Sequence, residues 1–124
     1  MRILLDTHIL LWWLSDDRRL PVPIGRALAD GANDILVSSI SIAEISIKTA
    51  IGKLRTPDDL LTQLRAAAMS LLPFTVDHAI ALRDLPAHHR DPFDRMLIAQ
   101  ALAESLTFAT VDPACRQYAV QTLG

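Results

Sequence analysis

The feature that most constrains the fold of this chain is an alternation of short apolar runs with longer helical patterns. The short, mainly apolar runs lie at residues 3–5, 35–37, 71–72 (followed by Phe74) and 106–109. Runs of this length without polar alternation are typical of strands that are buried on both faces. Strands that alternate with helices predict right-handed crossovers and one parallel sheet with helices on both sides. We therefore predict an α/β fold.

The helices are predicted from capping residues and 3.6-residue periodicity. They are expected over residues 7–14, 23–32, 39–51, 75–85 and 92–104, with a short final helix after Pro113. A further helix is expected to begin at Pro57 with Thr56 as its N-cap, because proline is favoured in the first turn. The segment 118–120 is expected to add an edge strand. Residues 7–14 are apolar on nearly every face, which predicts a helix buried all round or covered by a second chain.

Length and composition limit the class of protein. The 124 residues match one domain, which we assign to residues 1–124. With 51% hydrophobic residues and a mean hydropathy of +0.28, the chain is expected to fold. It has no run of 18 apolar residues, so no membrane span is expected. The first residues lack a signal-peptide pattern and Cys115 has no cysteine partner, so we expect a cytoplasmic protein.

The charge balance bears on possible partners. Twelve basic and fourteen acidic residues give a formal net charge of −2. This balance argues against a broad basic surface for nucleic acid. It leaves room for a local basic rim around an acidic metal site.

Four acidic residues lie at strand ends or in the first turns of helices: Asp6, Glu44, Asp94 and Asp112. Asp6 directly follows the first predicted strand, and Asp112 lies just past the fourth. Because sites in open parallel sheets form at the carboxyl ends of the strands, the four carboxylates are expected to converge on one cleft. Carboxylates in apolar surroundings need a partner, and a divalent cation would bind several of them at once.

Such a cluster favours metal-dependent chemistry on a phosphate substrate. Phosphodiester hydrolysis needs a nucleophilic water and neutralisation of charge on phosphate oxygens, and one or two Mg²⁺ or Mn²⁺ ions provide both. Without metal the carboxylates repel one another, which predicts an electrostatically strained apo site. The hydroxyls of Thr7, Ser39, Ser41 and Thr110 are candidates to orient a metal-bound water, although such hydroxyls more often cap helices or bond locally.

Each acid also has a structural interpretation. Asp6 and Asp112 can act as N-caps, and Asp91 is the evident cap of the helix that opens with Pro92. Asp94 then lies at N3, where a carboxylate interacts favourably with the helix dipole. Glu44 can pair with Lys48 four residues on.

Other kinds of site find no support in the sequence. The spacing of the four histidines matches no zinc pattern, and His88 and His89 are expected in a solvated turn. There is no glycine-rich phosphate loop and no serine in a glycine-flanked elbow. Trp12 and Trp13 are expected in the core or at a subunit interface, and Cys115 is expected to be a small structural residue.

The segments that carry these acids resemble the PIN domain, and more closely the ribonuclease toxins of type II VapBC toxin–antitoxin modules. The resemblance rests on LLDTH at 4–8, SISIAEISIK at 39–48, LPAHHRDPFDRMLIAQ at 85–100 and TVD at 110–112. It covers essentially the whole chain in the right order. The stretch HRDPFDRMLIAQA is its most specific part.

The resemblance implies a three-layer α/β/α fold with a parallel sheet of four or five strands. It implies a Mg²⁺- or Mn²⁺-dependent endoribonuclease that is often a homodimer. The acids listed above occupy the family's metal-binding positions, with Asp6 and Asp94 most central, and Thr110 matches a hydroxyl near the metal. Ala43 departs from the tryptophan that many relatives carry before the glutamate, which should alter local packing but not metal binding.

In this family a cognate VapB-type antitoxin covers the cleft. The helix that carries Trp12 and Trp13 and the helix expected from Pro57 are candidate walls of its groove, so Trp12→Ala should weaken antitoxin binding.

Two other functions stay open at this point. The chain is either an active nuclease or a catalytically degenerate PIN module that only binds RNA or a protein partner. A phosphatase with Asp6 as covalent nucleophile is disfavoured, because such enzymes usually carry a second aspartate two residues on, where this chain has His8.

Overall fold

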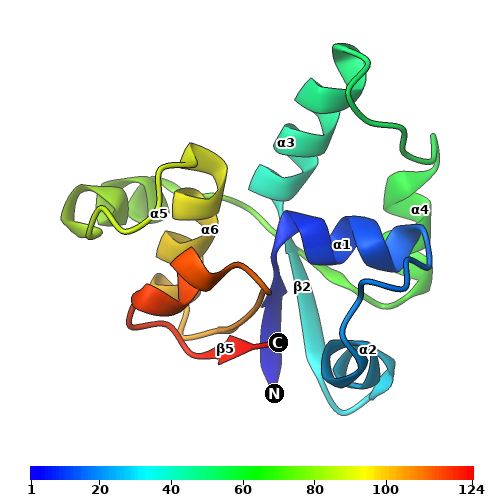
Figure 1. Cartoon of the computed structure of the whole chain (residues 1–124), viewed down its shortest axis with the longest axis horizontal. Helices are drawn as coiled ribbons and strands as arrows, with labels where there is room; N and C mark the ends of the chain where they lie inside the picture. The colour runs from blue at the N-terminus through cyan, green and yellow to red at the C-terminus, as the bar shows by residue number, and fades with distance from the viewer.

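A central sheet of five parallel strands organises the computed structural model, which describes all residues from 1 to 124 (Figure 1). The strands are β1 Arg2–Leu5, β2 Asp34–Ser38, β3 Ser70–Leu72, β4 Thr107–Ala109 and β5 Thr122–Leu123. Their order is β3-β2-β1-β4-β5, so β1 is central. In the register of the sheet, Leu4 pairs with Leu36 on one side and with Phe108 on the other. The predicted parallel α/β sheet is confirmed.

Helices cover both faces of the sheet. They are α1 Thr7–Leu14, α2 Val22–Ala29, α3 Ser39–Ala50, α4 Leu60–Ala66, α5 Val76–Ala81 and α6 Pro92–Ala103, with 3₁₀ turns at Leu82–Asp84 and Pro113–Gln117. In Figure 1, α5 and α6 lie on one side of the central strands and α1, α2 and α4 on the other. This is the three-layer α/β/α arrangement that the family resemblance implied.

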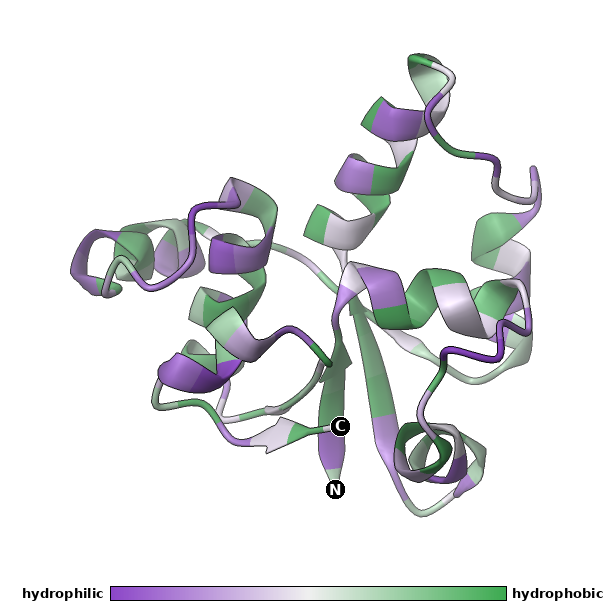
Figure 2. Cartoon of the chain, in the orientation of Figure 1, coloured by the Kyte–Doolittle hydropathy of each residue, from purple (hydrophilic) through white to green (hydrophobic).

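The two faces of β1 bury different cores. Ile3 and Leu5 pack in one cluster, together with Ile9, Ile24 and Ile45. Leu4 points to the other face and packs in a second cluster, which includes Phe108 and several residues of α6. Both clusters are apolar, which explains why the strand sequences show no polar alternation. Figure 2 shows β1 and β2 as hydrophobic over most of their length.

Two predicted elements are wrong. The helix expected from Pro57 begins at Leu60, because Thr56 and Pro57 continue as an extended segment against α1. The Thr56 hydroxyl lies 3.4 Å from the Thr49 hydroxyl and caps no helix.

The edge strand expected at 118–120 lies instead at Thr122–Leu123. Tyr118 is buried in the second core cluster. Its hydroxyl accepts a hydrogen bond of 2.8 Å from the backbone N–H of His89. The side chain that made 118–120 resemble a strand therefore serves core packing instead.

The helix α1 is less enclosed than its sequence predicted. Ile9 and Leu10 are buried, whereas Trp12 and Trp13 are half-buried and His8 is exposed. One long side of α1 is thus open to solvent. No helix of the structure is both long and apolar enough to cross a membrane.

Candidate metal centre

Asp6 lies at the carboxyl end of the central strand β1 and N-caps α1, so it has both the site position and the capping role considered for it. Its side chain is buried, with 3% exposure. The Thr110 hydroxyl donates to Oδ2 at 2.7 Å, and the His8 backbone N–H donates to Oδ1 at 3.3 Å. Burial raises the pKa of Asp6 above its ordinary value, and these two hydrogen bonds partly offset the rise.

Glu44 reaches the same region from α3, which begins directly after β2 with Ser38 as its N-cap. Its Oε2 atom accepts a hydrogen bond of 2.6 Å from Lys48 Nζ, so the predicted i,i+4 pair forms. This hydrogen bond raises the pKa of Lys48. The other oxygen, Oε1, is buried and has no hydrogen-bond partner. A buried carboxylate oxygen without a partner is unfavourable, so Lys48 alone does not explain Glu44.

Asp94 lies in the first turn of α6 and is the most perturbed acid. Burial, together with the negative charges of Asp6, Asp91 and Glu44, raises its pKa to about 7. Asp91 caps α6 by accepting from the N–H groups of Phe93 (2.8 Å) and Asp94 (3.3 Å), so its predicted capping role is confirmed. The effect of Asp6 and Glu44 on Asp94 places the three carboxylates in one electrostatic cluster. The predicted convergence therefore holds for these three.

Asp112 lies at the edge of this cluster. It caps the 3₁₀ turn by accepting from Ala114 N–H at 2.9 Å, and its Oδ2 lies 2.7 Å from His89 Nε2. Burial acts to raise the pKa of Asp112, but the hydrogen bonds from His89 and Ala114 outweigh it and lower the pKa. Asp112 thus has partners within the protein.

His89 belongs to the site, and the expectation of a solvated turn was wrong for this residue. Its Nδ1 accepts from the Asp91 backbone N–H at 3.1 Å, so in the neutral ring the proton is on Nε2. That nitrogen lies 2.7 Å from Asp112 and 3.1 Å from Asp94. His89 therefore donates towards two of the candidate carboxylates. Two adjacent polar residues read as a turn, and only its place just before the capping Asp91 pointed to the site.

The candidate hydroxyls divide into two groups. Thr110 bonds Asp6 and is placed to hold that carboxylate. Thr7 and Ser41 are hydrogen-bonded to each other at 2.9 Å and are buried, which joins α1 to α3. The Ser39 hydroxyl accepts from Phe74 N–H.

A second group of potential ligands, His89, Asp112 and Cys115, has donor atoms within 4.8 Å of one another. Two of its atoms carry protons. Nε2 of His89 is protonated in the tautomer described above. Burial and the nearby carboxylates Asp6, Asp112 and Asp94 raise the pKa of the Cys115 thiol to about 12. This trio is poorly suited to a metal, whereas an unpartnered Glu44 oxygen beside Asp6 and Asp94 matches the oxygen ligands of a hard divalent cation.

Comparison with known proteins agrees with this fold and site. The PIN domain model matches residues 3–121, and the chain belongs to the PIN domain family. Ribonuclease VapC22 of Mycobacterium tuberculosis is 27% identical over 123 residues, which cover 94% of this chain and 91% of that protein.

Solved structures share the fold at low identity. VapBC from Salmonella typhimurium bound to DNA has a TM-score of 0.71 at 17% identity, covering 99% of this chain and 97% of that one. VapBC2 from Rickettsia felis, bound to a DNA fragment from its promoter, has a TM-score of 0.70 at 16% identity, covering 99% and 98%. VapBC-1 from nontypeable Haemophilus influenzae has a TM-score of 0.68 at 18% identity, covering 99% and 97%.

Proposed function

We propose that this protein is a metal-dependent endoribonuclease toxin of a type II toxin–antitoxin module. The observation that carries the proposal is the buried carboxylate cluster at the ends of β1, β2 and β4. Within it, Glu44 Oε1 has no partner and the pKa of Asp94 is about 7. The similarity to a protein named ribonuclease VapC22 supports RNA as the substrate. The likeness to structures of VapBC complexes supports the toxin–antitoxin context.

In this proposal Asp6, Glu44 and Asp94 hold the cation, with Asp112 at its edge. Mg²⁺ or Mn²⁺ would supply the activation of water and the neutralisation of phosphate charge. Thr110 holds Asp6 in place through its hydrogen bond at 2.7 Å. Lys48 holds one oxygen of Glu44 and leaves the other free.

His89 completes the second layer of the proposed centre. It orients Asp94 and Asp112 from a ring whose tautomer is held by the Asp91 backbone. Groups that orient metal ligands in this way are worth 10–100-fold in metal affinity or activity.

Replacing Asp6 by asparagine tests the assignment. We expect Asp6→Asn to lower RNA cleavage in Mg²⁺ by at least about a hundredfold, because even groups that only orient metal ligands contribute up to that amount. Asp34→Asn, an exposed aspartate at the start of β2, is the matched control. Circular dichroism of each variant checks the fold. Cleavage by Asp6→Asn at the wild-type rate would refute the assignment.

A degenerate PIN module that only binds RNA or protein is the alternative. Calorimetric titration with Mn²⁺ separates the two functions. An active centre should take up Mn²⁺ at a specific site and lose that uptake in Asp94→Asn, whereas a degenerate module should show no such uptake in the wild type.

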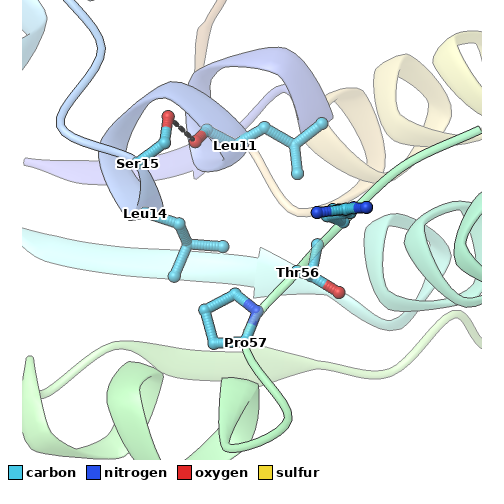
Figure 3. Close-up of a pocket in the computed structure, with 6 residues that line it drawn as sticks. Leu11, Leu14, Ser15, Thr56 and Pro57 are labelled. Atoms are coloured by element: carbon cyan, nitrogen blue, oxygen red, sulfur yellow. Dashed lines mark hydrogen bonds between the residues drawn. The ribbon is translucent and has the colours of Figure 1, made fainter.

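A VapB-type antitoxin is the proposed protein partner. Between α1 and the segment before α4 lies a cavity of about 230 Å³, lined by Leu11, Leu14, Ser15, Arg55, Thr56 and Pro57 (Figure 3). Its apolar walls suit an apolar antitoxin side chain. Leu14→Asp should therefore weaken binding of the cognate antitoxin in a pull-down with the purified proteins. The homodimer that the resemblance implies is a prediction for light scattering.

A further inference from the structure

The largest hollow of the structure is a groove of about 410 Å³ along the open side of α1. We call it the α1 groove. One wall is formed by His8, Leu11 and Trp12, and the other by Lys48, Lys53 and Arg55. The groove is separate from the apolar cavity described above, although Leu11 and Arg55 line both.

The α1 groove begins at the candidate metal centre. His8 follows the N-cap Asp6, and its charge acts on the pKa of both Asp6 and Asp112. On the opposite wall, Lys48 is bonded to Glu44. Both walls therefore start from residues that touch the carboxylate cluster, and the groove leads away from it towards the C-terminal end of α1.

The charge of the α1 groove is opposite to that of the whole chain. Four cationic side chains and one carboxylate line it, whereas the chain has a net charge of −2. Arg19 is neutralised by Asp17 at 2.8 Å, and Lys48 by Glu44. Lys53 and Arg55 are exposed and form no ion pair. Their two charges are thus available to an anionic ligand, and a groove concentrates such a field.

The α1 groove also offers a flat aromatic surface. Trp12 is half-buried, with the His8 ring centroid 6.3 Å from its own and the Arg19 guanidinium 5.3 Å from its ring centroid. Nucleobases stack on aromatic side chains and on arginine, and cationic side chains follow the phosphates of a single strand.

From this combination we propose that the α1 groove binds the single-stranded RNA that extends from the scissile phosphate, with Lys53 and Arg55 on phosphates and a base on Trp12. The inference rests on the proposed nuclease function. An acidic peptide would match the charge, but it would not need the aromatic platform or the direct connection to the metal centre.

The test measures RNA binding in an Asp6→Asn background, which prevents cleavage. A fluorescein-labelled 12-nucleotide single-stranded RNA is titrated at several salt concentrations and followed by anisotropy. Lys53→Ala/Arg55→Ala should weaken binding roughly 10- to 30-fold at 100 mM salt and reduce the salt slope by about 1.4, because each phosphate contact on a single strand contributes about 0.7. Arg26→Ala/Arg83→Ala, a pair of exposed arginines outside the groove, is the matched control.

A second variant separates stacking from charge. Trp12→Leu keeps an apolar residue against the core and should weaken RNA binding about tenfold with an unchanged salt slope. Trp13→Leu, which lies outside the groove, should have no such effect.

The outcomes distinguish the two proposals. If Lys53→Ala/Arg55→Ala and the control pair bind RNA with equal affinity and slope, the inference is overturned, as expected if the groove receives a protein partner instead. If the wild type fails to cleave RNA in Mg²⁺ while the groove variants lose RNA binding, the nuclease assignment fails and the RNA groove stands.

Discussion

The raised pKa of Asp94 makes a prediction about stability that can be worked out from the structure. Its carboxyl shifts from 3.8 to about 7 because of burial and the charges of Asp6, Asp91 and Glu44. Below about pH 4 the group is protonated in both the folded and unfolded states, and there is no penalty. Between about pH 4 and 7 the unfolded chain loses this proton while the folded protein keeps it, so stability falls as pH rises. Above pH 7 the penalty is complete.

The magnitude follows from the shift. At 1.36 kcal/mol per pKa unit, the full shift corresponds to an upper limit of about 4 kcal/mol. The Asp94 side chain is 14% exposed and sits in a cluster that opens to solvent, so screening reduces the effect to about 2 kcal/mol. Asp94→Asn removes the penalty and retains an oxygen that can accept from His89.

We therefore expect metal-free Asp94→Asn to be more stable than the wild type at pH 8, by about 2 kcal/mol or roughly 8 °C in melting temperature. The difference should vanish near pH 4. Thermal unfolding in EDTA at pH 4, 6 and 8 measures it, with Asp34→Asn as the control. Mg²⁺ should stabilise the wild type more than the variant, because the ion relieves the repulsion. Equal or lower stability of Asp94→Asn at pH 8 would refute the strained apo site.

Three further predictions concern neighbouring residues. His89→Ala should lower RNA cleavage 10–100-fold at saturating substrate, and His89→Gln should restore part of the rate because its amide can still donate; equal rates for the two variants would contradict the positioning role. Thr110→Val should destabilise the metal-free protein by about 1.5–3 kcal/mol in urea unfolding, because it removes a hydrogen bond to the buried Asp6 carboxylate. Thr107→Val, a buried threonine of the adjacent strand without a side-chain hydrogen bond, should change stability less. Cys115, with its pKa of about 12, should react with iodoacetamide at pH 8 only after unfolding; rapid reaction of the native protein would show that the thiol is accessible.

Local signals predicted the helices whose capping partners are close in sequence. Asp91 and Pro92 marked the start of α6, and its cap bonds connect residues only two or three apart. The helix from Pro57 failed although its signal is equally clear, because Thr56 and Pro57 pack against α1. A tertiary contact therefore outweighed the local preference.

The candidate acids were found from the sequence because the topology of a parallel α/β sheet brings strand ends together. What that reasoning missed was the pairing state of each one. Glu44 was weighed as a simple partner of Lys48, and only the structure reveals that its second oxygen is buried without a partner.

By itself the sequence determined the class of fold and the places of the acids. Strand burial and helix periodicity are properties of residues within one segment, and in a parallel sheet the carboxyl ends must lie on one edge. Only the tertiary structure decided the role of His89, which bridges Asp94 and Asp112 on either side of it in the chain, and the basic groove between Trp12 and Arg55. Those arrangements depend on distances and directions between segments far apart in the chain, which no local pattern encodes.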